Sequence, residues 1–354
     1  MSAGPVTVLP VESLPVSIVR PVCAPAKAVT TDRLALLDAV RLVAALGIVW
    51  VHAAESAADQ WLHPLGTFGV PFYTFVAVLF MARTLTRPGG RSLASYAVGR
   101  VTRLYGPFLF WSAVYVGLAG AKHLSRDHGF TLPNPVLLYT GGHDHLWFLP
   151  FLMVVTLLGA VLVRGVQRLP MMRWPLVATL VVVGIIAAAL PEPAWVMRRP
   201  FDFDFWRFVL RASPTVFWSI ALALATAIGG RLPRSTPALA IAGGVLLLLC
   251  LALQSVWMDA KALRAFAGLG CVAIALLPLA SPLVTRLGSL GRHSYGIYLS
   301  HLVFVRIAVA VVERFQGTPT LASDAVTFVF AFTAAAALSV ALSKSKWTRW
   351  TLGE

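Results

Sequence analysis

An arginine and a histidine stand at the two ends of an apolar segment, RLVAALGIVWVH, at residues 41–52. Eleven positions at about 100° each come to about 1100°, or about 20° beyond three full turns, so a helix places Arg41 and His52 on one face, about 16 Å apart. Asp38 precedes Arg41 by three residues, which is close enough to pair with the guanidinium and orient it. A guanidinium can bind phosphate and a neutral imidazole can accept a proton. This helix face could therefore bind an anion at one end and transfer protons at the other.

The surroundings of Arg41 and His52 decide whether that chemistry is possible. A lone arginine within the hydrocarbon costs about 2.5 kcal/mol or more, and such residues normally face the interior of a bundle or a watery cavity. We therefore expect this face to line a passage. In the alternative interpretation, Arg41 extends to the cytoplasmic headgroups and His52 is an ordinary residue of the outer interface.

A second basic motif, YAVGRVTRLYGPF, occupies residues 96–108. Arg100 and Arg103 are one helical turn apart, at the cytoplasmic entrance of an apolar segment. Two guanidiniums on one helix face could clamp phosphate groups. Alternatively, they are only the basic residues that follow the positive-inside rule.

A histidine and a tryptophan, His145 and Trp147, begin another apolar segment, HLWFLPFL, at residues 145–152, directly after His143 and Asp144. His143, Asp144 and His145 could be considered as metal ligands, but neighbours at i and i+2 do not converge on a helix, and we expect no metal site. Trp147 is also the kind of residue that marks a membrane interface.

The motif SYGIYLSH, residues 294–301, places Tyr295, Tyr298 and His301 in a late apolar segment, with Arg306 beyond them. Polar groups at that depth are better accommodated in a cavity than in lipid.

The composition determines the class of protein that must position these residues. Hydrophobic residues make up 58% of the 354, charged residues make up 12%, and the mean hydropathy is +0.80. A soluble domain of this length could not bury so much apolar surface, so most of it must face lipid. The net charge is +15, and the basic residues that produce it lie between the apolar runs, where they indicate topology. We therefore expect no nucleic-acid partner. The odd set of Cys23, Cys250 and Cys271 has no paired spacing and predicts neither a disulfide nor a metal site.

Apolar stretches of about 20 residues, enough to cross a hydrocarbon core of about 30 Å, predict an all-α polytopic membrane helix bundle with about ten transmembrane helices. The predicted spans are 34–54, 66–86, 104–124, 145–164, 174–191, 208–229, 236–257, 262–281, 294–312 and 323–343. Residues 33–343 thus form the transmembrane domain. The Pro-, Val- and Ala-rich residues 1–32 are expected to be a disordered cytoplasmic tail, and 344–354 a basic one.

The distribution of charge predicts the orientation. If the amino terminus is cytoplasmic, 18 of the 29 Lys and Arg residues fall in cytoplasmic loops and 9 in loops on the other side, where most of the acidic residues also lie. The positive-inside rule then places both termini in the cytoplasm.

Four of these motifs together resemble the integral-membrane acyltransferase type 3 family. The segment 36–52 is similar to that family's first-helix signature, in which a Leu-Asp precedes an arginine, ten residues and a histidine. GRVTRLYGPF at 99–108 matches its paired arginines before a proline, HLWFL at 145–149 matches its fourth-span motif, and SYGIYLSH at 294–301 matches its late Tyr-Gly-x-Tyr-Leu-x-His motif. Their order and spacing agree over about residues 33–343.

One segment departs from the family pattern. The second span keeps the Val-Pro-Phe of part of the family at residues 70–72, but has Ala77, Val78 and Leu79 where Ser-Gly-Phe is expected. The extracytoplasmic esterase-like domain of some members is also not found.

The resemblance implies an acyl-CoA-dependent O-acyltransferase in the membrane, most simply the bacterial inner membrane. The acyl group, usually acetyl, would pass from cytoplasmic acyl-CoA to a hydroxyl of a surface or exported carbohydrate, lipid-linked or polymeric, at or beyond the far side of the bilayer. Acetyl-CoA would be the donor substrate, and no permanently bound cofactor or metal is implied.

The resemblance also suggests roles for individual residues. Arg41, Arg100 and Arg103 would bind the phosphates of CoA, with Asp38 holding Arg41 in place. The long pantetheine arm would then direct the thioester toward His52, which would take the proton from the acceptor hydroxyl or carry the acyl group itself. Help with the acceptor or the oxyanion is expected from His145, Trp147, Tyr295 and His301.

A transporter or flippase of lipid-linked sugars is the alternative, because the same polar residues could line a translocation path without chemistry. No internal repeat is visible, and no Gly- or Pro-interrupted spans occupy matching positions, which argues mildly against it. Binding or hydrolysis of acyl-CoA would distinguish the two.

Overall fold

The computed structural model describes residues 34–56, 62–124, 136–191, 205–226, 231–257, 260–316 and 318–353, and also Gly4. By their contacts, residues 1–33 and residues 34–354 form two separate units, and the described helices all belong to the second. Apart from Gly4, the tail predicted at 1–32, with Cys23, lies outside the described residues.

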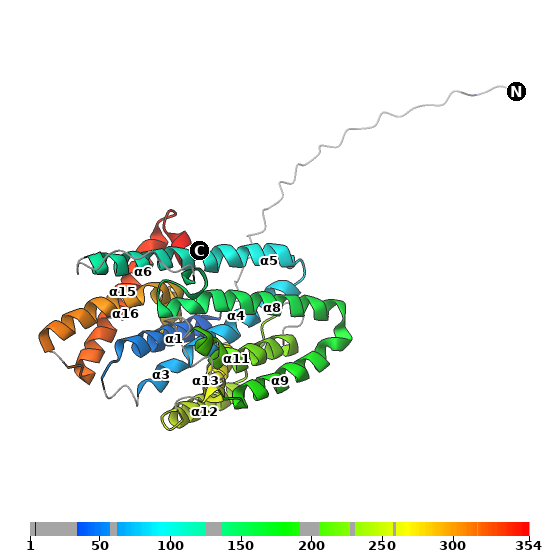
Figure 1. Ribbon diagram of the computed structural model, residues 1–354. Coiled ribbons are helices and arrows are strands. Elements are labelled where there is room, and N and C mark those ends of the chain that lie inside the picture. Colours follow the sequence, from blue (N-terminus) through cyan, green and yellow to red (C-terminus); the bar gives the residue numbers. More distant parts are fainter. Residues whose placement is uncertain are drawn as a thin grey trace. The chain divides into compact units, whose positions relative to one another are not determined.

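The described residues form helices and no strand, which confirms the all-α class. Figure 1 shows how the helices are arranged. The helices are α1 Ala35–Ala53, α3 Pro64–Thr67, α4 Gly69–Thr86, α5 Leu93–Arg100, α6 Gly106–Leu124, α7 Leu137–Thr140, α8 Phe148–Arg168, α9 Arg173–Ala189, α11 Phe205–Thr226, α12 Pro237–Gln254, α13 Lys261–Ala275, α14 Pro282–Gly291, α15 Ser294–Gln316 and α16 Leu321–Lys344, with the short turns η1 Val101–Tyr105, η2 Asp144–Trp147, η3 Pro170–Met172 and η4 Arg349–Leu352.

Nine helical segments of the described chain are long and apolar enough to cross a membrane, so the polytopic class is confirmed with a lower count than the predicted ten. The difference lies at the span predicted for 262–281, where α13 has 15 residues and ends at Ala275. At 1.5 Å per residue it is about 22 Å long, which is shorter than a hydrocarbon core of about 30 Å. Pro278 follows closely and cannot continue a regular helix. This short helix packs against α12, α4, α1 and α11.

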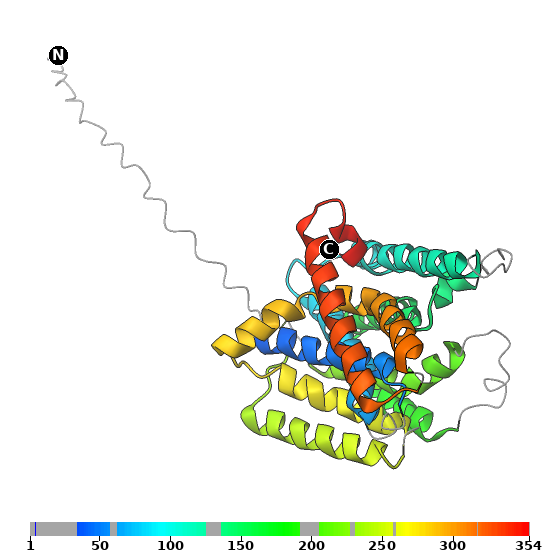
Figure 2. The same ribbon diagram turned by 90° about the vertical axis from the view of Figure 1, so that its left-hand side faces the viewer.

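Helix α1 lies among several other helices. It packs against α14, α15, α3, α16, α13 and α4. In Figure 2, α15 and α16 (orange to red) lie beside α1 (blue). Small side chains on its buried face, Ala44 and Ala45 among them, allow this close packing. The helix is continuous from Asp38 to His52, as the geometry of the one-face prediction requires.

The first turn of α1 rests directly on the end of α14. A Cβ added at Gly291 would lie 1.8 Å from the carbonyl oxygen of Asp38, so only glycine permits this contact. Helix α15 begins three residues later. The sequence between α14 and α15 therefore fixes the late tyrosine and histidine motif relative to α1.

The third span is interrupted. Helix α5 passes through the π-helical turn η1 into α6, and the turn begins immediately after Arg100. Single π-helical turns within α-helices are rare and frequently occur at functional sites.

Candidate active site

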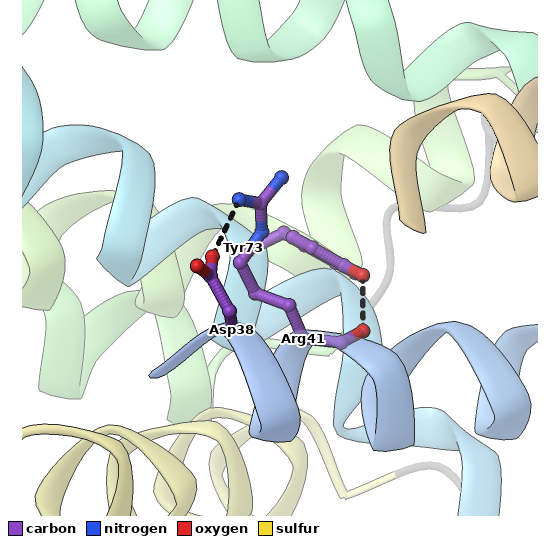
Figure 3. Close-up of polar contacts among 3 residues, drawn as sticks. All are labelled: Asp38, Arg41 and Tyr73. Carbon is purple, nitrogen blue, oxygen red and sulfur yellow. Dashed lines mark hydrogen bonds and ion pairs between the residues drawn. The ribbon is translucent and has the colours of Figure 1, made fainter. Parts of the chain in front are cut away.

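The first polar cluster surrounds Arg41, near the start of α1 (Figure 3). The Nη1 atom of Arg41 lies 3.3 Å from Oδ1 of Asp38, so the predicted ion pair is present. The Tyr73 hydroxyl, from α4, donates a hydrogen bond to the Arg41 carbonyl oxygen at 2.6 Å. The side chains of Arg41 and Asp38 are 30% and 11% exposed. The guanidinium is thus oriented by a nearly buried carboxylate and remains accessible.

Arg100, the last residue of α5, contacts α4, the helix that also contacts Arg41. Nε of Arg100 donates to the Tyr96 hydroxyl at 2.6 Å, and Nη2 donates to the Ala77 carbonyl oxygen at 3.4 Å. Tyr73 and Ala77 are one helical turn apart on α4 and share a face. That face therefore contacts both Arg41 and Arg100. Ala77, whose carbonyl oxygen accepts from Arg100, is the first residue of the Ala-Val-Leu segment that departs from the family pattern.

Arg103 lies within the π-helical turn η1, directly after the end of α5 at Arg100. Because η1 intervenes, the two residues do not have the spacing of a regular α-helix. Arg100 is partly buried against α4, whereas Arg103 is exposed. The Tyr295 hydroxyl donates a long hydrogen bond, 3.5 Å, to the Arg103 carbonyl oxygen. Tyr295 thus lies beside the arginines.

The C-terminal hook, residues 345–353, also contacts the backbone of Arg103. Gly353 has a φ of 72°, and a Cβ placed on it would lie 2.4 Å from the Arg103 carbonyl oxygen. Nε1 of Trp111, on α6, donates to the Thr351 carbonyl oxygen at 3.1 Å, and Thr351 and Leu352 are buried. Part of the segment expected to be a basic tail is therefore packed beside the arginines.

The second polar cluster lies at the other end of α1 and consists of four histidines, which we call the imidazole cluster: His52, His143, His145 and His301. The ring centroid of His301 lies 5.3 Å from that of His52 and 5.1 Å from that of His145. The centroids of His52 and His145 are 6.3 Å apart, and those of His143 and His145 are 5.5 Å apart. Three predicted site residues from α1, η2 and α15 thus meet in space.

Two tyrosines border the imidazole cluster. The Tyr115 ring, from α6, lies 5.2 Å from His145 and 5.3 Å from His143, and its hydroxyl donates to the Leu299 carbonyl oxygen at 2.9 Å. The Tyr298 hydroxyl donates to the His145 carbonyl oxygen. Tyr115 had no predicted role, because it belongs to no motif and reaches the histidines only through the packing of α6.

Several nitrogens in the imidazole cluster are buried with no hydrogen-bond partner in the described part of the chain. They are Nε2 of His301 and both ring nitrogens of His145. The His301 side chain is fully buried and His145 is 4% exposed, whereas His52 is partly exposed. Unpaired buried polar atoms are costly and are retained where a ligand or a reaction uses them.

Two other predicted residues, Trp147 and Tyr295, make contacts of a different kind. Trp147 is buried and stacks on Phe208, with ring centroids 5.4 Å apart, so its contacts are those of a packing residue. Tyr295 lies beside Arg103, at the other end of the site. The described residues contain no group of three or more His, Cys, Asp or Glu side chains arranged to hold a metal ion.

A groove adjoins the end of α1, directly after His52. Its lining includes Ala53, Glu55, Glu313 and Asp324. The Asp324 carboxylate accepts hydrogen bonds from the backbone N–H groups of Glu55 at 3.2 Å and Ser56 at 3.1 Å. The first turn of α16 thereby fixes the chain that leaves α1.

Comparison with known proteins places the whole helical region in one family. Neither the curated proteins nor the solved structures give a match. A family model described as an acyltransferase domain, that of the acyltransferase type 3 family, matches residues 34–344. This range contains α1 to α16, and with them the arginines and the imidazole cluster. The chain therefore belongs to the acyltransferase type 3 family of membrane proteins.

Proposed function

We propose that this membrane acyltransferase moves an acyl group, most simply acetyl, from cytoplasmic acyl-CoA to a hydroxyl of a carbohydrate on the far side of the bilayer. The carbohydrate would be a surface or exported one, lipid-linked or polymeric. The protein would act in the bacterial inner membrane without a permanently bound cofactor.

The observation that carries this proposal is the placing of two different polar clusters along α1. Arg41 lies near one end, where Arg100 contacts the same face of α4, and His52 lies near the other end within the imidazole cluster. Eleven residues of helix separate Arg41 from His52 by about 16 Å. A phosphate-bearing donor with a long flexible arm could be held at the first cluster while its thioester reaches the second.

The chemistry needs a group that accepts a proton beside the thioester carbonyl. In direct transfer, the acceptor oxygen forms a bond to the carbonyl carbon, the carbon–sulfur bond breaks, and the hydroxyl proton passes through His52 to the departing sulfur. If His52 instead carries the acyl group, its ring nitrogen attacks the carbonyl carbon, the carbon–sulfur bond breaks, and the proton of the other ring nitrogen goes to the departing sulfur. The acceptor oxygen then bonds to the same carbon as the carbon–nitrogen bond breaks, and the hydroxyl proton returns to the His52 ring. Both routes need an unprotonated nitrogen of His52 facing the thioester.

The groove beyond His52 supports access for the acceptor from the other end. The carboxylates of Glu55 and Glu313 in its lining can accept hydrogen bonds from hydroxyl groups. A carbohydrate seated there would have a hydroxyl close to the end of α1.

The experiment measures acetyl-CoA binding and the release of CoA thiol by detergent-solubilised protein, using wild type and His52→Ala matched for amount. We expect wild type to bind acetyl-CoA and release thiol. His52→Ala should bind with similar affinity but release thiol at least about 10²-fold more slowly, because proton transfer by a positioned side chain contributes about 10²–10⁴-fold. Wild type that neither binds nor cleaves acetyl-CoA would favour the transporter alternative.

A further inference from the structure

The hydrogen bond of His301 determines which of its nitrogens carries the proton. Its Nδ1 lies 2.7 Å from the carbonyl oxygen of Tyr298, one turn earlier on α15. A carbonyl oxygen can only accept, so Nδ1 must be the donor. In the neutral ring Nε2 then has a lone pair and no hydrogen. It is an acceptor, and a neutral His301 cannot donate through Nε2 to an oxyanion.

This acceptor atom is buried beside His52. Nε2 of His301 has no hydrogen-bond partner among the described residues, and the side chain is fully buried. His52 is the more exposed of the two rings, and their centroids are 5.3 Å apart. Hydrogen bonds used in catalysis are often long in unliganded enzymes and tighten when substrate binds. His301 is therefore the buried ring of the pair, and His52 is the ring that can reach substrate.

His145 is less suited to be the partner of His52. Its centroid is farther away, at 6.3 Å, and no hydrogen bond within the described chain fixes its tautomer, because both of its ring nitrogens lack a partner. Of these two histidines, His301 has both the shorter distance and a defined acceptor nitrogen.

We propose that His301 is a positioning residue for His52, accepting an N–H of His52 at its Nε2. This holds His52 in the tautomer whose other nitrogen has a lone pair directed toward the thioester and the acceptor. When that nitrogen takes the proton of the acceptor hydroxyl, His301 stabilises the resulting imidazolium, and the shared proton stays on His52. The proton then passes to the departing sulfur, so no further reactant is needed. The catalytic part of this inference rests on the proposed function, whereas the tautomer of His52 does not.

The activity test compares three replacements of His301. Asn can still donate to Tyr298 but does not reach His52, Ala does neither, and the longer Gln can present an oxygen acceptor to His52. We expect Asn and Ala to lower kcat for thiol release from acetyl-CoA by about 10²-fold, with KM little changed, and Gln to restore part of it. Ser300→Ala is the matched control, since Ser300 is equally buried on α15 but bonds only to its own helix, at the Gly296 carbonyl. It should keep the wild-type kcat.

Two further measurements separate this role from a merely structural one. In the His52→Ala background, His301→Asn should cause no additional loss, because a residue that acts through His52 has nothing left to position. Nitrogen-15 NMR of the His52 ring in full-length protein should show one tautomer in wild type and a mixture in His301→Asn. An additional loss in the double variant, or a His52 tautomer unaffected by His301→Asn, would overturn the inference. If wild type cleaves no acetyl-CoA, the proposed function fails, but the NMR result still decides whether His301 positions His52.

Discussion

The three arginines near the start of α1 differ in what holds their side chains. Arg41 is paired with Asp38, Arg100 donates to Tyr96 and Ala77, and Arg103 is exposed. A contact with a remote phosphate stabilises the bound donor and the transition state about equally, so it mainly affects KM. An oriented group beside the path to the thioester also affects turnover. The three arginines should therefore respond differently to substitution.

Replacing Arg100 or Arg103 with alanine should raise KM for acetyl-CoA by about 10- to 100-fold and change kcat less, because each lost charge-assisted hydrogen bond is worth about 1.5–3 kcal/mol. Lysine should partly rescue the exposed Arg103, but Arg100 less, because an ammonium lacks the planar fork with which Arg100 donates from two separate nitrogens. Arg41→Ala should lower kcat as well. Steady-state kinetics of thiol release measures all of these.

Arg168→Ala is the control, since Arg168 is an exposed basic residue at the end of α8 and is expected on the same side of the membrane. It should leave KM unchanged. Equal acetyl-CoA affinity in all the arginine variants and wild type would show that these arginines serve only topology.

At the scale of residues, the sequence predicted what is local and left out what depends on packing. The ion pair of Asp38 and Arg41 was predictable because helix geometry brings i and i+3 together. The placing of His301 beside His52 follows from the packing of α15 against α1, and no spacing in the sequence encodes the distance. Tyr115 could not be foreseen for the same reason. The contacts of Tyr295 with the Arg103 carbonyl oxygen and of Trp147 with Phe208 also depend on packing and could not be foreseen.

Among the elements, the π-helical turn and the C-terminal hook distinguish the arginine region from a plain helix end. The hook touches the Arg103 carbonyl through Gly353, and Tyr295 touches it from α15. These two contacts hold the backbone of η1 at Arg103. Neither could be predicted, because π-helical turns have no simple sequence pattern and the hook reads as a polar tail.

Gly353→Ala tests the contribution of the hook. The added Cβ would meet the Arg103 carbonyl oxygen at 2.4 Å and would also be strained by the positive φ. We expect KM for acetyl-CoA to rise several-fold, with kcat less affected and the amount of folded protein preserved.

Gly89→Ala supplies the control, because Gly89 has a similar φ of 65° but no atom within 4 Å of the added Cβ. It carries the same backbone strain, about 1 kcal/mol, without pressing on η1. If the two alanine variants have the same KM, the hook does not position Arg103.

Helix α13 accounts for the difference between the predicted ten spans and the nine candidate spans of the described chain. The apolar run at 262–281 satisfies a composition rule, but the rule does not register that Pro278 interrupts the helix. Its buried residues are mainly small, Ala265, Ala267, Gly268 and Gly270 among them, as expected of a helix closely packed by its neighbours.

On the scale of the whole molecule, the class of fold was the most predictable feature. Backbone groups in lipid must be satisfied within a helix, so a long apolar run allows few alternatives. The order of the four motifs predicted the family, and the match of the family model over residues 34–344 confirms it. The orientation of the termini stays a prediction from the distribution of Lys and Arg.

The central claim is that the donor and the acceptor meet from opposite sides of the membrane. It can be measured in inside-out membrane vesicles from cells that make the protein, with radiolabelled acetyl-CoA supplied only to the outer solution, which corresponds to the cytoplasm. Vesicles with wild-type protein should incorporate label into envelope carbohydrate enclosed in the lumen, and vesicles with His52→Ala should not. Label confined to carbohydrate on the outer surface, or equal luminal label in both, would contradict the account.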